Sequence, residues 1–193
     1  MPRRASLATG CTLFVLAAAL AGCGNSRTPV PSLGSQAAAG TLRWLHYPAY
    51  GLSIRGPSTW LNRDGPAPLV TTFSLSDSVA ALWSYPRRTP PPSRASALAA
   101  ARTNLVAAAR RKDPSLRLIR ARVFTLGGYP AIELDAFEQL MGSPRRVRST
   151  HVFTGTSEVV LDEYAPIGIF HSVDHSVFSP LKRSLRLTSA ASG

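Results

Sequence analysis

The chain has 193 residues, which fits one domain together with targeting segments, because a domain typically takes about 100 to 200 residues. An apolar fraction of 45% and a charged fraction of 17% are those of a globular protein and exclude disorder along the whole chain. Its net charge of +12 favours attraction to anionic lipids or acidic polymers, although an arginine-rich composition also arises from a GC-rich coding bias.

The first 22 residues have the layout of a secretory signal peptide. Met1 to Arg4 form a short cationic start, and residues 13–20 form an apolar run that is too short for an ordinary transmembrane helix. The two cysteines are Cys11, inside this segment, and Cys23, directly after it. The mature chain is therefore expected to keep one cysteine and to form no internal disulfide.

The sequence Leu20-Ala21-Gly22-Cys23 resembles the lipobox of bacterial prolipoproteins. This resemblance implies cleavage before Cys23 and attachment of a diacylglyceryl group to its thiol, often with a further acyl chain such as palmitate on the new amino group. Two or three acyl chains at about 0.8 kcal/mol per buried methylene anchor a protein firmly. We therefore expect a lipoprotein on the extracytoplasmic face of the cell membrane; the alternative is a signal segment with an incidental cysteine.

Residues 23–40 are expected to be the lipidated cysteine and a flexible linker, because Ser, Pro, Gly, Ala and Gln predominate without an apolar pattern. A flexible chain of this length has an end-to-end distance of roughly 20 to 25 Å. The folded domain is expected over residues 41–188, followed by a disordered tail at 189–193.

The first half of the domain predicts strands followed by a helix. Residues 50–54 predict a strand, and residues 69–75 and 79–85 are apolar, β-rich segments around the polar turn 76–78, which suits a hairpin. After three prolines, residues 93–112 predict an amphipathic helix that packs on a sheet. Its apolar positions at helical spacing are Leu98, Ala101, Leu105 and Ala108.

The second half predicts an antiparallel meander. Residues 116–126 and 129–140 are joined by Gly127-Gly128, a favourable hairpin turn because glycine tolerates positive φ. A turn at 141–144 leads to strands at 145–154 and 158–164. A closing helical segment over 167–186 is expected to place its apolar residues on one side, with Pro180 leaving its regularity open; these residues are Ile167, Phe170, Val177 and Leu181. The predicted fold class is α+β, with an antiparallel sheet of about six strands flanked by two main helices.

Three segments of the domain resemble PsbP-type domains, a family that includes extrinsic photosystem subunits and many actinobacterial lipoproteins. They are Tyr50-Gly51-Leu52-Ser53-Ile54 with Pro57 and Trp60, the hairpin 126–131, and the ending 178–181 with 184–187. The resemblance implies an α/β/α sandwich and a binding or assembly role rather than catalysis. The lipobox and the basic composition depart from the photosynthetic members, so no ligand residues are carried over.

Two groups of polar residues are candidates for chemistry. His171 and His175 stand four apart on the predicted helix, but two ligands are too few for a zinc site, so solvent-facing histidines are expected. If the turns are as predicted, His151 lies opposite Leu134 and Val160, on one sheet face with Ser149 and with Asp162, which lies opposite Ser149. A hydrolase would use this group, although no Gly-x-Ser-x-Gly elbow is present, and the alternative is a polar cluster that bonds internally.

Charged pairs are expected on another face. Glu133 and Asp135 share a strand face that the same registers give to Arg146 and Arg148, which favours salt bridges. A second possibility is contact with lipid phosphates or an acidic partner, through Arg87, Arg88, Arg145, Arg146 and Arg148. Trp44, Trp60 and Trp83 are expected in the core or packed on the sheet.

These features together predict a non-enzymatic binding or assembly-support module of the cell envelope. Its expected partners are the membrane, through lipid on Cys23, and an envelope protein; no metal, cofactor or nucleic acid is expected. An alternative is a small-ligand or lipid carrier, which needs a sizeable apolar cavity that a sheet filled by two helices should lack. A hydrolase that uses His151 is the third hypothesis.

Overall fold

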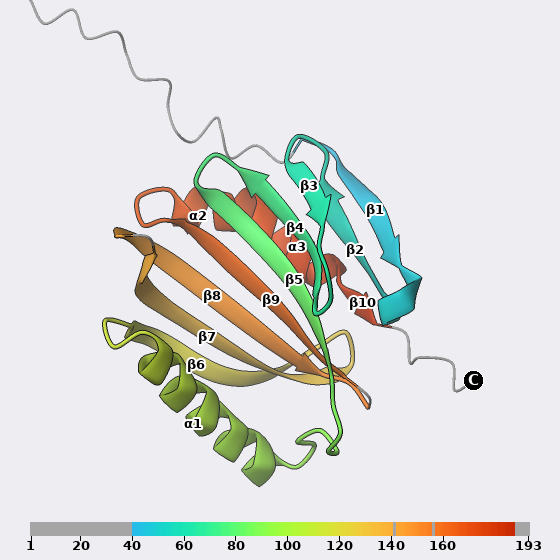
Figure 1. Cartoon of the computed structure of the whole chain (residues 1–193), viewed down its shortest axis with the longest axis vertical. Helices are drawn as coiled ribbons and strands as arrows, with labels where there is room; N and C mark the ends of the chain where they lie inside the picture. Colours follow the sequence, from blue (N-terminus) through green and yellow to red (C-terminus); the bar gives the residue numbers. More distant parts are fainter. Residues whose placement is uncertain (1–39, 141, 156, 188–193) are drawn as a thin grey trace, which may run out of the picture. The chain divides into compact units, whose positions relative to one another are not determined.

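The structure, a computed structural model, describes residues 40–140, 142–155 and 157–187. The predicted signal peptide, the lipid attachment at Cys23, nearly all of the predicted linker and the predicted tail lie outside the described residues. The fold contains a seven-stranded antiparallel sheet, a three-stranded sheet, helix α1 and a helical segment near the C-terminus (Figure 1).

The main sheet has the strand order β3-β4-β5-β9-β8-β7-β6. Its last four strands form the predicted meander. In chain order the strands are β3 (Leu61–Asp64), β4 (Leu69–Leu75), β5 (Ser78–Pro86), β6 (Arg117–Leu126), β7 (Tyr129–Leu140), β8 (Ser143–Phe153) and β9 (Ser157–Pro166). Strands β8 and β9 lie in the interior of the sheet, so the side chains of both their faces contribute to the sites described below.

The smaller sheet has the order β1-β2-β10, with β1 (Leu42–Tyr47), β2 (Leu52–Pro57) and β10 (Arg186–Leu187). The 3-10 turn η2 (Pro48–Tyr50) joins β1 to β2 and ends at Gly51, whose φ of 61° is readily adopted by glycine. Because β10 pairs with β2, the end of the domain lies beside its beginning.

The C-terminal helical segment is continuous from α2 (Phe170–Val173) through the π-helical turn η3 (Asp174–Phe178) to α3 (Ser179–Ser184). Pro180 lies in the first turn of α3, directly after the π-helical turn η3. The segment packs its apolar side on β2 and β9 and completes the main core. The largest fully buried side chains there include Ile54, Phe73, Leu82, Leu161, Phe170, Phe178 and Leu181.

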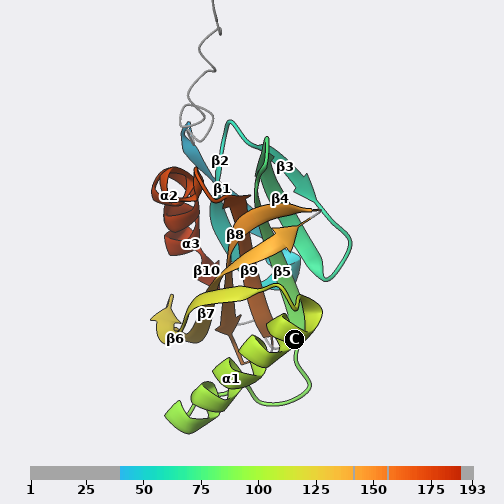
Figure 2. The same ribbon diagram turned by 90° about the vertical axis from the view of Figure 1, so that its left-hand side faces the viewer.

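Helix α1 (Ala95–Lys112) packs on the opposite face of the main sheet, mainly against β6 and β7. Figure 2 shows the helix at the end of the molecule away from α2 and α3. Leu98 of the helix packs with Ile132, Leu134 and Phe153 in a second, smaller core. The face of the sheet formed by β5, β9 and β8 is thus only partly covered on this side.

No helix in the described part of the chain has the length and hydrophobicity needed to span a bilayer.

The predicted fold class is confirmed, with seven strands in the main sheet rather than about six. Strands β1 and β3 were not predicted; β3 has four residues, none of them buried, and therefore carries no alternating pattern. The first predicted strand, 50–54, begins two residues early, because residues 48–50 form η2. In the closing segment Ile167 is 46% exposed rather than on the buried side with Phe170, since it precedes the helix.

Candidate functional site

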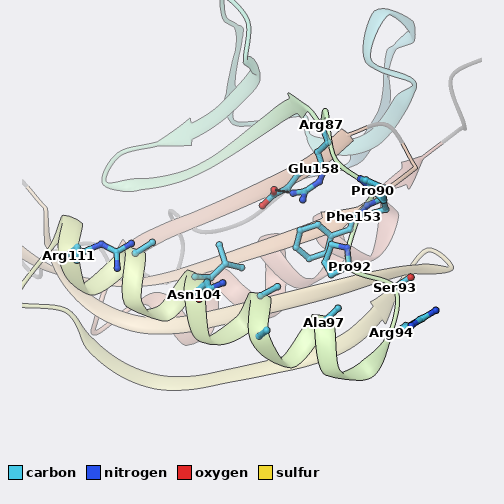
Figure 3. Close-up of a pocket in the computed structure, with 15 residues that line it drawn as sticks. Arg87, Pro90, Pro92, Ser93, Arg94, Ala97, Asn104, Arg111, Phe153 and Glu158 are labelled. Atoms are coloured by element: carbon cyan, nitrogen blue, oxygen red, sulfur yellow. Dashed lines mark hydrogen bonds and ion pairs between the residues drawn. The ribbon is translucent and has the colours of Figure 1, made fainter.

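A groove runs beside helix α1, between the helix and the open part of the sheet face. A cavity of about 720 Å³ forms one half of this groove (Figure 3). Figure 3 shows Asn104 and Arg111 on the helix, Arg87, Phe153 and Glu158 on the sheet side, and Pro90 and Pro92 at one end. We call this cavity, together with the adjoining cavity described below, the α1 groove.

Small side chains on one side of α1 leave the groove open. The helix packs on the sheet through Leu98 and Leu105, and most of the helix residues that line the cavity are alanines. The lining alanines are Ala97, Ala100, Ala101 and Ala108. The expectation that two helices fill both sheet faces is therefore wrong, because α1 covers β6 and β7 and its alanine side does not reach across to β5 and β9.

A second cavity of about 500 Å³ shares Leu105, Ala108 and Glu158 with the first, so the two adjoin. It lies under the C-terminal half of α1, and its floor is the sheet face of β8 and β9. The floor and walls are largely polar and aromatic, with Tyr85, Lys112, Glu138, Ser149, His151, Glu158, Asp162 and Tyr164.

A chain of hydrogen bonds crosses the floor of the groove. Arg87 Nη1 donates to Glu158 Oε2 at 2.7 Å, and Glu158 Oε1 lies 2.8 Å from His151 Nδ1. On the other side of the ring, His151 Nε2 lies 3.1 Å from Ser149 Oγ, which donates to Asp162 Oδ1 at 2.6 Å. Five side chains, four from β8 and β9 together with Arg87 just after β5, thus hold one another in fixed positions.

The two carboxyl groups of this chain, Glu158 and Asp162, have opposite pKa shifts. Burial raises the pKa of Glu158, but the hydrogen bond and charge of His151 and the charge of Arg87 outweigh burial, so the net pKa is lowered. For Asp162 burial outweighs the hydrogen bond from Ser149, and the pKa is raised. Burial, followed by the charge of Asp113, also raises the pKa of Glu138. Of these carboxylates, Glu158 is the one firmly held as an anion.

The two tyrosines of the groove are held as neutral hydroxyls. Burial, followed by the charges of Asp162 and Glu158, raises the pKa of Tyr85. Burial and the neighbouring carboxylates raise the pKa of Tyr164 as well. Each hydroxyl group can therefore donate a hydrogen bond to a molecule in the groove or accept one from it.

The predicted grouping of Ser149, His151 and Asp162 is confirmed, whereas one predicted register is wrong. Ser149 pairs with Asp162 and His151 with Val160, as expected, but His151 lies opposite Ile132 rather than Leu134. The β7–β8 hairpin closes between Leu140 and Ser143, with Gly142 at a φ of 77°. This tighter turn shifts the pairing by two residues, which keeps every side chain on the predicted face.

Glu158 was not identified from the sequence as a partner of His151. The alternation of Glu158, Val160 and Asp162 on β9 places all three on the face that His151 shares, and this was the signal that the sequence offered. Positions two apart along a strand are separated by about 7 Å, which is too far for a hydrogen bond between short side chains. The long side chains of His151 and Glu158, from neighbouring strands, bridge this separation.

The five arginines expected at a partner or lipid surface lie in different places. Arg87 bonds to Glu158 in the groove, and Arg88 is exposed. Arg145 lies 3.7 Å from Asp77, and Arg146 makes two bonds to Asp135 on the face away from α1. Arg148 lies on that same face in the interior, with only 8% of its side chain exposed. These arginines form no single patch, and their contact with a partner stays a prediction.

Arg148 belongs to a buried ionic network between the sheet and the C-terminal helices. Its guanidinium bonds to Glu163 of β9 and to Asp174 of η3. Nearby, Lys182 of α3 bonds to Glu133, which also accepts a bond from Arg122. The predicted salt bridges are thus confirmed for Arg146 with Asp135, while Arg148 and Glu133 pair with other residues. His171 and His175, on the outer side of the helical segment, are exposed.

No family model matches the chain, and no curated protein matches it. Among solved structures, the fold is similar to cyanobacterial PsbP (CyanoP) from Synechocystis sp. PCC 6803, with 12% identity, a TM-score of 0.60, and coverage of 77% of this chain and 93% of that one. It is also similar to LpqN of Mycobacterium tuberculosis, described as involved in cell envelope biogenesis, with 17% identity, a TM-score of 0.54, and coverage of 77% and 91%. At these identities the similarity establishes a shared PsbP-like and LpqN-like fold.

Proposed function

We propose that this protein is a lipid-anchored binding or assembly-support module of the cell envelope, which receives its partner or ligand in the α1 groove and catalyses no reaction. The sequence motif that ends at Cys23 supports the anchor. The similarity of the fold to LpqN, a protein involved in cell envelope biogenesis, is consistent with an envelope role.

The open groove is the observation that carries this proposal. Its larger cavity, about 720 Å³, falls within the range of about 300 to 1,000 Å³ that is usual for ligand sites. The larger cavity offers an apolar wall of alanines, prolines and Phe153 with Arg94 and Arg111 at its edge, and the smaller one offers fixed polar groups. Such a surface fits an extended partner segment or a small molecule with both polar and apolar parts.

The surroundings of Ser149 argue against catalysis. Ser149 lies in the middle of β8, with β7 paired on one side and β9 on the other, so the backbone around it is engaged in the sheet rather than free to stabilise an oxyanion. Its hydroxyl hydrogen is directed to Asp162. The hydrogen bonds of Ser149, His151 and Glu158 therefore support a rigid polar floor.

An alternative function is a carrier of a small ligand or lipid, which the two adjoining cavities favour. A carrier and an assembly-support module differ in what occupies the groove. A partner protein would be captured covalently from the groove, whereas a carried small molecule would copurify with the protein and be released by denaturation.

Photocrosslinking from two neighbouring alanines of α1 tests the groove. Ala100 lines the groove and Ala99 does not, although both are exposed on the same helix. With a photoreactive amino acid at position 100 of the anchored protein in intact cells, we expect a discrete adduct with an envelope protein or ligand, and none from position 99. Additional replacement of Asn104 by Trp, which narrows the groove, is expected to abolish the adduct. Equal adducts from both positions would contradict the proposal.

Ester hydrolysis separates the proposal from the hydrolase hypothesis. We expect the wild-type protein, Ser149→Ala and His151→Ala to hydrolyse nitrophenyl esters at the same background rate, because the backbone around Ser149 is paired in the sheet and its hydroxyl donates to Asp162. Circular dichroism of each variant serves as the control for folding. Turnover by the wild-type protein that disappears in both variants would establish the hydrolase instead.

The anchor has its own test. Cys23→Ser removes the thiol that the lipid requires, so we expect the protein to move from the membrane fraction to the soluble fraction. Mass spectrometry of the mature wild-type N-terminus should show acyl chains on Cys23. A free thiol there, in protein that still sediments with membranes, would contradict the anchor.

A further inference from the structure

We propose that the outer face of the small sheet lies on the anionic membrane surface and fixes the orientation of the tethered domain. We call this face the Trp44 face; it consists of Trp44 and His46 of β1, Arg55 of β2 and Arg186 of β10. The inference rests on the proposed lipid anchor at Cys23, but it assigns a surface separate from the α1 groove and a partner of defined chemistry, a bilayer with anionic phosphates.

The strand pairing places these four side chains together. Trp44 pairs with Arg55 across β1 and β2, and Arg186 pairs with Ser53, which also pairs with His46. The guanidinium carbon of Arg186 lies 4.7 Å from the centre of the Trp44 ring, and that of Arg55 lies 5.9 Å from it. The His46 ring is stacked on Trp44 with 6.3 Å between ring centres. The result is an indole ring flanked by two arginines on one surface.

The arginines of the Trp44 face are not neutralised by carboxylates. Among the described residues, neither Arg55 nor Arg186 forms an ion pair, and Arg55 Nη2 donates one bond, to the carbonyl oxygen of Leu42 at 3.3 Å. Arg146 and Arg148 differ, because each is bonded to a carboxylate. The Trp44 face therefore keeps donors available for phosphate oxygens, which guanidinium groups bind with two parallel bonds.

The exposed indole suits a membrane interface. Trp44 is 40% exposed, whereas Trp60 is buried in the core at 4%. Of the tryptophans expected in the core or packed on the sheet, Trp44 lies on the outer surface of the small sheet. An indole ring is favoured at the level of lipid headgroups, where its apolar body and its N–H group meet both environments.

The position of β1 along the chain points to the membrane as the occupant of this face. Strand β1 begins at Leu42, so it is the element of the described chain that lies nearest to Cys23 in the sequence. The linker predicted from the sequence has a typical end-to-end distance of roughly 20 to 25 Å. A tether of this kind holds the domain near the membrane at a millimolar effective concentration, so even weak contacts between the domain and the membrane surface persist. Attraction between arginines and anionic headgroups then acts over about 8 Å at physiological salt.

Fluorescence quenching of the lipidated full-length mature protein in vesicles tests the proposal. Vesicles of phosphatidylcholine, with or without phosphatidylglycerol, carry brominated acyl chains that quench a tryptophan at the interface. We expect strong quenching with phosphatidylglycerol, and at least a several-fold loss of it without phosphatidylglycerol or in about 1 M salt, where the Debye length falls to about 3 Å. Trp44→Phe should remove the quenching, because Trp60 and Trp83 lie elsewhere.

Two matched double variants test the arginines. Arg55→Glu with Arg186→Glu is expected to reduce quenching to the level of Trp44→Phe. Arg110→Glu with Arg117→Glu makes the same charge change at exposed positions of α1 and β6 and should leave quenching unchanged. Thermal unfolding of both proteins checks that the fold is retained. Equal quenching in the two double variants, or in the two kinds of vesicle, would overturn the proposal.

Cosedimentation separates this inference from the proposed function. If the wild-type protein fails to cosediment with vesicles, the anchor itself fails and with it the proposed function. If it cosediments but Trp44 is not quenched, the anchor stands and the Trp44 face is overturned. Protection of Trp44 from an aqueous quencher without vesicles, rising with protein concentration, would assign the face to a second copy of the chain and also overturn the proposal.

Discussion

Replacing Arg148 with Met is expected to lower the free energy of unfolding by about 3 to 5 kcal/mol, the usual cost of removing one partner from a buried ion pair. Arg148 lies between Glu163, which is fully buried, and Asp174. Methionine has a similar length but no charge, so Glu163 would remain in the interior without its cation. Urea unfolding followed by circular dichroism measures the change, and Arg145→Met, at a surface pair with Asp77, is the matched control with an expected change of about 0 to 1 kcal/mol.

The pH dependence gives the Arg148 prediction a second readout. Burial raises the pKa of Glu163 to about 7, above the value of 4.5 expected in the unfolded chain. Between these two values the folded state binds more protons, so the contribution of Glu163 to stability decreases as pH rises from 4.5 to 7. We therefore expect Arg148→Met to be destabilised less, relative to the wild-type protein, near pH 4.5 than above pH 7. Near pH 4.5 Glu163 is neutral in the folded state and does not need its cation.

A double variant separates the cost of an unpaired charge from the cost of lost packing. Arg148→Met with Glu163→Leu removes the cation and its fully buried partner and leaves the partly exposed Asp174. We expect it to be more stable than Arg148→Met alone, since apolar pairs often replace buried ion pairs without loss. A double variant as unstable as the single variant would show that the cost comes from the unpaired Asp174 and from lost packing on Phe170, whose ring centre is 5.6 Å from the guanidinium carbon, rather than from Glu163.

Phe178→Ala is expected to cost about 3 to 5 kcal/mol of unfolding free energy, as is typical when a buried phenylalanine is truncated. Phe178 is fully buried between Trp60, with 6.0 Å between ring centres, and Phe170, at 5.7 Å. It joins the C-terminal helical segment to the main core, so its removal leaves a cavity at the junction. Urea unfolding measures the change.

An exposed residue that precedes the helical segment serves as the control for Phe178. Ile167→Ala removes apolar atoms from a side chain that is 46% exposed, and we expect a change within about 0.5 kcal/mol. If Phe178→Ala lowered the free energy of unfolding as little as Ile167→Ala does, the C-terminal segment would contribute little to cooperative unfolding.

Local patterns in the sequence were sufficient for most of the meander and for α1. Residues 129–140 form β7 with the predicted bounds, because Gly127-Gly128 fixes the start of the strand and apolar residues alternate with Glu133 and Asp135 in its middle. Residues 95–112 form α1 within the predicted range, because Leu98 and Leu105 recur at helical spacing. In both cases the information lies within about twenty neighbouring residues.

The short strands at the beginning of the domain were not predictable in the same way. Strand β3 is held by hydrogen bonds to β4 rather than by buried side chains of its own. Strand β1 pairs with β2, and β2 also pairs with β10 from the other end of the domain. Pairing partners of this kind become evident only when distant segments are brought together.

The sequence by itself determined the α+β class, the antiparallel meander and the face that Ser149, His151 and Asp162 share, since strand alternation has a period of two and survives a register shift of two residues. The tertiary structure alone decided that α1 covers β6 and β7 and leaves a groove, that Glu158 bonds to His151, and that Arg148 is buried while Arg55 and Arg186 are not. These features depend on how far side chains from separate elements reach across a shared surface. The spacing of residues along one strand or helix does not determine the distance between side chains of separate elements.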